Sequence, residues 1–114
     1  MSTTGNHPRS DEILTNAVKR AATGLGINSR QLALILSTDE SNLETSIDPE
    51  SHEGFRARQF ILIFRHLQAL LGNNSSAMAH WVETENREFE STPIDRMQTA
   101  LGLNEVIAYL ESIG

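Results

Sequence analysis

The hydrophobic positions of this chain recur every three or four residues, which is the spacing of one face of an α-helix. The first such stretch follows Ser10, a candidate N-cap, and places Asp11 and Glu12 in the first turn, where a helix favours acidic side chains. Its hydrophobic positions are Ile13, Leu14, Ala17, Val18 and Ala21. Gly24 ends the pattern, which therefore predicts a first helix between Ser10 and Gly24.

Two short hydrophobic stretches follow and predict a pair of short helices. The first has its start signal at Ser29 and stops at Ser37. Ser37 and Glu40 then have the spacing of a capping box, and Leu43 with Ile47 would anchor a second short helix along one edge. Two short helices with a tight joint are a candidate helix-turn-helix.

The dipeptide Asp48–Pro49 interrupts this pattern, because proline disfavours a helical conformation of the residue before it. Beyond the break, a long helix is predicted over residues 54–71. Its hydrophobic positions are Phe60, Ile63, Phe64, Leu67, Leu70 and Leu71, with Ile61 and Leu62 widening the face. A face this wide predicts a central helix with neighbours on several sides. In so small a chain it also predicts a homodimer.

Three shorter helices are predicted after Gly72, namely residues 77–82, a helix that begins at Thr92, and residues 104–113. The start at Thr92 is the clearest, because an N-cap threonine is followed by proline at the first helical position and aspartate at the third. The last helix has one hydrophobic face, made of Val106, Ile107, Leu110 and Ile113. Since every strong periodic signal is helical, the sequence predicts an all-α fold with more than half of its residues in helices.

The order of these elements divides the chain into three regions. Residues 1–9 are polar and are expected to form a flexible arm. Residues 10–58 are expected to form the helix-turn-helix-like module, and residues 59–114 the long central helix with a small C-terminal helical domain. A length of 114 residues suits one compact domain or two small helical modules that share a core.

Nothing in the sequence predicts contact with a membrane. No stretch approaches the roughly 18 consecutive apolar residues of a membrane-spanning helix, and the first residues lack the basic and apolar segments of a secretory signal. The chain has no cysteine from which to build disulfides or thiolate metal sites. We therefore expect a cytoplasmic protein.

The charge of the chain is unevenly distributed. The net charge of −6 argues against a general nucleic-acid-binding protein, which usually has a basic surface. Up to Arg58 the chain has 6 basic and 8 acidic residues, a net −2, and after Arg58 it has 3 basic and 7 acidic residues, a net −4. The C-terminal half is therefore the acidic one.

If the helix-turn-helix candidate binds DNA, the first exposed residues of its second helix would read the bases. These residues include Asp39, Glu40 and Glu44, which would repel phosphates. Alternatively, the acids only stabilise the start of that helix. The candidate DNA contacts are Ser41, Asn42 and Thr45 to bases, and Arg30, Arg56 and Arg58 to phosphates. We expect any binding to be weak or confined to one operator, and sensitive to salt.

The sequence carries no motif that predicts catalysis or a bound cofactor. It contains no nucleophile elbow, metalloprotease HExxH, phosphate-binding glycine loop or dinucleotide fingerprint. Two pairs of acids within residues 83–90 could in principle do acid–base chemistry, but a solvated acidic loop is the simpler interpretation. The four histidines lie far apart and lack metal-ligand spacing: His7, His52, His66 and His80. We expect no enzymatic activity, no metal and no cofactor.

A series of positions in the second half of the chain has the order and nearly the spacing of a known family. The matching positions are Ala79, Trp81, Val82, Asn86, Phe89, Thr92, Pro93, Met97, Gly102, Val106 and Leu110. With them, residues 70–114 resemble the toxin-binding domain of the Xre/MbcA/ParS antitoxins. Leu32, Ala33 and Leu43 are similar to the family's Xre-like helix-turn-helix. However, Ser37 stands where glycine is usual, and the recognition helix is acidic rather than basic.

The resemblance implies the antitoxin of a type II toxin–antitoxin system, which itself performs no chemistry and binds a RES-domain toxin that consumes NAD. In such proteins the N-terminal module usually represses the operon, and the C-terminal domain covers the active-site cleft of the toxin. The two departures from the family pattern weaken the repressor role and leave toxin binding untouched. Two alternatives stay open: an Xre-type DNA-binding transcriptional regulator without a toxin partner, and a helical dimerisation or adaptor module.

Within the resembling segment, some residues are expected to shape the domain and others to contact the toxin. Trp81 is expected in the core, Pro93 at a helix start and Gly102 at a turn. The candidate toxin contacts are the polar groups beside them: Asn86, Arg96, Glu105, Tyr109 and Glu111. Because the toxin cleft binds the phosphates of NAD, we expect it to be electropositive and to meet the acidic half of this chain.

Overall fold

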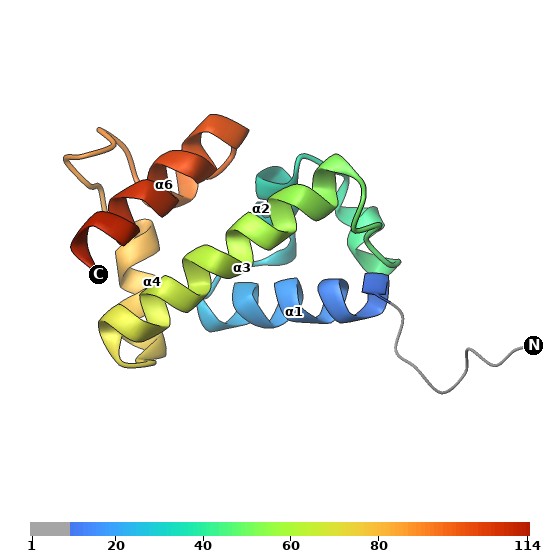
Figure 1. Ribbon diagram of the computed structural model, residues 1–114, viewed down its shortest axis with the longest axis horizontal. Helices are drawn as coiled ribbons and strands as arrows, with labels where there is room; N and C mark the ends of the chain where they lie inside the picture. The colour runs from blue at the N-terminus through green and yellow to red at the C-terminus, as the bar shows by residue number, and fades with distance from the viewer. Residues whose placement is uncertain (1–9) are drawn as a thin grey trace, which may run out of the picture.

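The computed structural model describes residues 10–114, which fold into helices joined by short loops (Figure 1). In chain order the helices are α1 (Ser10–Gly24), α2 (Ser29–Leu36), the 3₁₀ helix η2 (Glu40–Glu44), α3 (His52–Leu71), α4 (Ser75–Glu83), α5 (Pro93–Arg96) and α6 (Ala100–Ile113). Within this range there is no strand, and an isolated bridge joins Asn86 to Ser91. The predicted all-α fold is confirmed, whereas the arm expected over residues 1–9 lies outside the described residues.

Helix α3 is the central element of the fold. It contacts α1, α2, α4 and α6, and Figure 1 shows it running diagonally between α1 and α6. Its buried positions are spaced three or four residues apart: Gly54, Ala57, Phe60, Ile63 and Leu67. The helix thus has neighbours on several sides, as its wide hydrophobic face predicts. No helix within residues 10–114 combines the length and the hydrophobicity that a membrane span requires.

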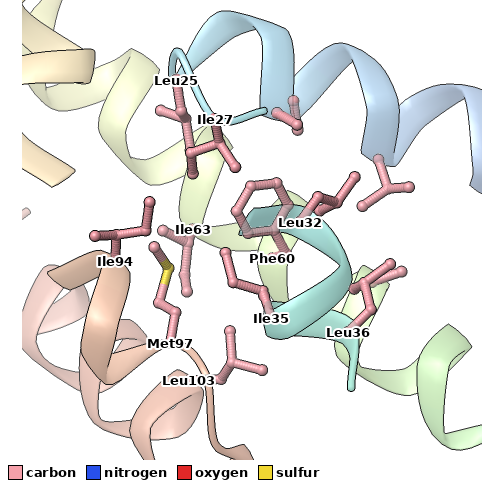
Figure 2. Packing of buried hydrophobic residues seen from close by; sticks show 14 of the residues in the cluster. Leu25, Ile27, Leu32, Ile35, Leu36, Phe60, Ile63, Ile94, Met97 and Leu103 are labelled. Carbon is pink, nitrogen blue, oxygen red and sulfur yellow. The ribbon is translucent and has the colours of Figure 1, made fainter. Parts of the chain in front are cut away.

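A hydrophobic core joins the segments before and after α3. Figure 2 shows side chains that meet there: Leu25, Ile27, Leu32, Ile35 and Leu36 before α3, Phe60 and Ile63 on α3, and Ile94, Met97 and Leu103 after it. The boundary expected between residues 58 and 59 therefore falls inside the continuous helix α3. The N-terminal and C-terminal segments pack together around that helix.

Two helix starts test the capping chemistry that the sequence suggests. Thr92 is the N-cap of α5, as predicted, and its hydroxyl oxygen accepts a hydrogen bond from the Asp95 N–H at 3.2 Å. Helix α2 begins at Ser29, as predicted, and the residue before it caps the helix. Asn28 is the N-cap, because its side chain accepts from the Gln31 N–H at 2.8 Å while the Gln31 side chain accepts from the Asn28 N–H at 3.0 Å.

The segment between α2 and α3 departs from the predicted second helix of the helix-turn-helix. The capping box of Ser37 with Glu40 is wrong, because Ser37 is the left-handed C-cap of α2, with φ +60°. The residue at the N-cap position, Asp39, makes no side-chain cap hydrogen bond. The expected second helix is present as the 3₁₀ helix η2. Leu43 and Ile47 are buried, in agreement with their expected role as anchors.

Candidate functional site

Three aromatic side chains from different elements form a cluster at the C-terminal end of the molecule. Trp81 comes from α4, Phe89 from the loop before α5, and Tyr109 from α6. The rings of Trp81 and Tyr109 are stacked, with centroids 6.5 Å apart and planes 20° from parallel. Phe89 is buried and meets Tyr109 edge-on at 5.4 Å. Because Trp81 and Tyr109 are only half-buried, the cluster reaches the surface.

The loop between α4 and α5 is closed by hydrogen bonds of its own residues. We call residues 84–91 the acidic loop. The Asn86 N–H donates to the Ser91 carbonyl at 3.0 Å, and the Asn86 side-chain oxygen accepts from the Glu88 N–H at 2.9 Å. Glu90 takes a left-handed conformation, with φ +56°. Asn86, predicted as a toxin contact, therefore helps to set the shape of this loop.

The side chain of Arg96 connects the acidic loop to α6. Its Nη2 donates a hydrogen bond to the Phe89 carbonyl, and its Nη1 lies 3.5 Å from Glu105 Oε1 on α6. The Arg96 Nε is buried and has no hydrogen-bond partner. Arg96 and Glu105, both predicted as toxin contacts, are thus paired with each other, although about a third or more of each side chain stays exposed, at 35% and 43%.

A shallow groove opens where the aromatic cluster meets the acidic loop. Its lining residues are Trp81, Thr84, Glu85, Asn86, Arg87, Glu88 and Tyr109, and its volume is about 400 Å³. Glu83 and Glu90 are exposed nearby on the same segment. We call this site the aromatic–acidic groove, because half-buried rings form one part of it and carboxylates the other.

Glu111, the fifth predicted toxin contact, lies elsewhere. It is two residues beyond Tyr109 on α6, which places it about 200° further around the helix. Its side chain is 58% exposed, and its Oε2 lies 4.0 Å from His66 Nε2 on α3. The structure therefore brings Asn86 and Tyr109 together at the groove, and it places Glu111 on the side of α6 that faces α3.

Two residues expected to shape the domain do so in different ways. Pro93 stands at the predicted helix start, in the first turn of α5. Gly102, expected at a turn, instead lies buried in the first turn of α6. A side chain at Gly102 would overlap the Arg96 carbonyl group, with the carbonyl carbon only 2.7 Å from the added Cβ atom. Glycine is therefore required there by close backbone packing rather than by a turn.

The candidate base contacts of the helix-turn-helix lie on or beside η2. Ser41, Asn42 and Thr45 are exposed. The Asn42 side chain donates to the Thr38 hydroxyl at 2.8 Å, and the Thr45 hydroxyl donates to the Asn42 carbonyl at 3.1 Å. A 3₁₀ helix of five residues is about 10 Å long, which is short for an element that must follow the major groove.

The three candidate phosphate contacts differ in how the fold uses them. Arg56 Nη1 lies 3.3 Å from both the Ile35 carbonyl and the Gln98 carbonyl, and it donates to them. Arg56 thus ties the end of α2 to the turn before α6. Arg58 Nη1 donates to the Pro49 carbonyl at 3.0 Å, and Arg30 is exposed in the first turn of α2.

The acidic loop is the part of the site that the sequence was least able to predict. Its glutamates are exposed, in agreement with the predicted solvated loop, but Glu85 and Glu88 also line a groove with aromatic neighbours. The available signal was the position of this run between Trp81 and Phe89. Across residues 10–114, no group of three His, Cys, Asp or Glu side chains is arranged to hold a metal ion.

The comparison with protein families bears on this same part of the chain. Residues 66–114 match the family model described as the antitoxin Xre/MbcA/ParS C-terminal toxin-binding domain, and no curated protein sequence matches the chain. The matched range begins in the second half of α3 and includes α4, the acidic loop, α5 and α6. This family is not a class of enzymes. The C-terminal part of the chain is therefore similar to the toxin-binding domain of the Xre/MbcA/ParS antitoxins, and this similarity supports an antitoxin role.

Proposed function

We propose that this protein is the antitoxin of a type II toxin–antitoxin system and that it neutralises a RES-domain toxin that consumes NAD. The family match of residues 66–114 carries the proposal, because a toxin-binding domain implies a toxin partner. That range contains all five residues predicted to contact the toxin. By covering the active-site cleft of the toxin, the C-terminal domain would exclude NAD without performing chemistry itself.

The charge of the C-terminal half supports this choice of partner. The chain after Arg58 carries a net −4, and a cleft that binds the phosphates of NAD is expected to be electropositive. Complementary charges on two proteins raise the rate of association and select the correct partner. An exposed hydrophobic side chain on α6, Leu101 at 68% exposure, offers apolar contact area beside these charges.

The test uses the product of the gene beside this one, which the proposal expects to be a RES-domain toxin. Co-expression of both proteins should restore growth and cellular NAD, and the two proteins should co-purify. Leu101→Glu, on α6, should weaken neutralisation, whereas Leu34→Glu should not, because Leu34 is similarly exposed at 51% but lies on α2, outside the matched range. Failure of the full chain to bind or neutralise the toxin would disprove the proposal.

We also propose that the protein forms a homodimer through the face shared by α1 and α3. A groove on this face is lined mainly by apolar side chains, and Ile13 and Leu62 are exposed there at 56% and 39%. Arg58 and Arg65 border the groove, while α1 begins with acidic residues in its first turn. A two-fold axis through this face would bring the apolar side chains of two protomers together.

Sedimentation at micromolar concentration tests this dimer. The unaltered protein should sediment as a dimer and Leu62→Lys as a monomer, because a third cation beside Arg58 and Arg65 in a buried face strongly disfavours association. Leu34→Lys is the matched control and should stay dimeric. A monomeric unaltered protein, or equal effects of both substitutions, would contradict the proposal.

The proposed function also includes contact with operator DNA. The glutamates of η2 lie beside the candidate base contacts, and Arg56 already donates to two carbonyls. We propose that binding to operator DNA is weak and falls steeply with salt. Fluorescence anisotropy with the promoter and with random duplex tests this, and nanomolar affinity for random duplex at physiological salt would contradict it.

A further inference from the structure

The aromatic–acidic groove has the chemistry of a receptor for a basic side chain. We infer that it binds an arginine in a basic surface segment of the toxin, with the guanidinium against the rings of Trp81 and Tyr109. This inference rests on the proposed function and specifies which face of the domain meets the toxin.

The rings present an aromatic surface held in a defined orientation. Trp81 and Tyr109 are nearly parallel, at 20°, and both line the groove. Phe89 supports Tyr109 edge-on from the buried side at 5.4 Å. A guanidinium within about 6 Å of an aromatic face is attracted by the ring quadrupole, most strongly by tryptophan and tyrosine. Arginine suits such a surface better than lysine, because its planar group can also stack.

The charge at the groove selects a cation. Glu85 and Glu88 line the groove together with a single basic residue, Arg87. Residues 83–90 contain 4 acidic residues and 1 basic residue, a net −3. Carboxylates beside an aromatic face can pair with the same guanidinium that the ring attracts. An anionic partner such as nucleic acid would be repelled, so a basic segment of the toxin is the occupant that fits.

The groove is already shaped by hydrogen bonds within the chain, before any partner binds. The acidic loop is closed by the hydrogen bonds of Asn86 to Ser91 and from Glu88, and Arg96 holds the Phe89 carbonyl. A site that is already ordered loses less conformational entropy on binding. Arg96, the arginine that holds the loop, is paired with Glu105 on α6. It therefore does not compete with an incoming guanidinium for the carboxylates of the loop.

The test measures the affinity of the full-length chain and its variants for the purified toxin. Glu85→Gln with Glu88→Gln removes the charge from the groove, and Tyr109→Leu removes an aromatic face. We expect each to raise the Kd about tenfold or more. The groove double variant should also lose much of the salt dependence of binding. Thermal denaturation of every variant separates these effects from loss of folding.

A matched control distinguishes a groove from a general effect of charge. Glu40→Gln with Glu44→Gln on η2 removes the same charge from another exposed acidic segment. This control variant should change the Kd less than about twofold. Equal effects of groove and control variants, or an unchanged Kd for folded groove variants, would overturn the inference while the proposed function stands. If the unaltered chain does not bind the toxin, both fail.

Discussion

Two exposed acidic segments, η2 and the acidic loop, resemble each other in sequence and differ in what lies beneath them. Each contains two or three glutamates, and each has a residue in the left-handed conformation nearby, Ser37 before η2 and Glu90 within the loop. Beneath η2 is an aliphatic anchor, Leu43, which is buried in the hydrophobic core. The acidic loop instead lies against three aromatic rings and is held by an arginine from α5.

The comparison shows why acidity alone is a poor guide to function. Carboxylates on η2 interact with water and with their own helix, so their presence mainly weakens any contact with DNA. Carboxylates of the acidic loop stand beside ring faces that a partner can cover, and burial of aromatic surface contributes most of the energy of many interfaces. The functional difference thus arises from tertiary packing, which joins α4, the loop and α6.

The largest loss of stability is expected from a substitution at Gly102. Gly102 packs against the backbone of Arg96, and the Arg96 side chain in turn holds the acidic loop through the Phe89 carbonyl. In Gly102→Ala the new methyl group would overlap the Arg96 carbonyl and approach the Thr99 hydroxyl oxygen within 2.9 Å. The backbone of α5 must move to make room, so we expect a loss of about 3 kcal/mol in the free energy of unfolding. Urea denaturation measures this loss, and toxin affinity should fall with it.

Gly72→Ala is the matched control for this substitution. Gly72 ends α3 with φ +66°, and an added Cβ atom would meet nothing within 4 Å. Only the left-handed conformation is strained, so the loss should be about 1 kcal/mol. A loss at Gly102 no greater than at Gly72 would show that the backbone around Arg96 yields easily.

A smaller and more local effect is expected at Arg96. Arg96→Gln removes the hydrogen bond to the Phe89 carbonyl and the ion pair with Glu105. Because Arg96 is about one-third exposed, we expect a loss of about 1–2 kcal/mol in stability. Amide hydrogen exchange in the acidic loop should accelerate about tenfold, while exchange in η2 should not change. Equal acceleration in both segments would mean that Arg96 stabilises the whole fold rather than the loop.

Much of the helical fold follows from periodicity and capping signals. The long helix over residues 54–71, the start at Thr92 and the hydrophobic face of the last helix are all present. The start of α2 at Ser29 is also as predicted, whereas its N-cap was not identified. Asn28 and Ser29 are both good N-caps, and the reciprocal hydrogen bonds of Asn28 with Gln31, three residues on, decide for Asn28.

The candidate site could be predicted only in part, because its residues are far apart in sequence. The sequence identified Asn86 and Tyr109, which the fold brings to the same groove. It could not reveal that Arg96 and Glu105 pair with each other, or that Glu111 faces α3. These relations depend on how α5 and α6 rotate about their axes, which is set by burial of Met97, Leu103 and other core residues.

The left-handed residues of the two acidic segments offer a comparison of smaller effects. Ser37→Gly and Glu90→Gly each relieve a positive φ, at +60° and +56°. Relief of this strain exceeds the extra entropy that glycine loses on folding, so we expect each to raise the free energy of unfolding by about 0.5 kcal/mol. Chemical denaturation tests both. A loss at Glu90 alone would indicate that its side chain makes a stabilising contact.

The smallest effect concerns acid sensitivity near η2, where Glu53 of α3 is close to Thr38. Burial raises the pKa of Glu53, but hydrogen bonds from its own N–H and from Ser51, the nearby His52 and the Thr38 hydroxyl lower it more, so the pKa lies below its ordinary value of 4.5. A carboxyl with a lowered pKa stabilises the folded state above pH 4.5, and this stabilisation is lost as the pH falls through the folded pKa. Glu53→Gln should therefore flatten the decline in stability below pH 4.5, and Thr38→Val should flatten it less. Denaturation measured across this range checks the order, and a steeper decline in Glu53→Gln would contradict it.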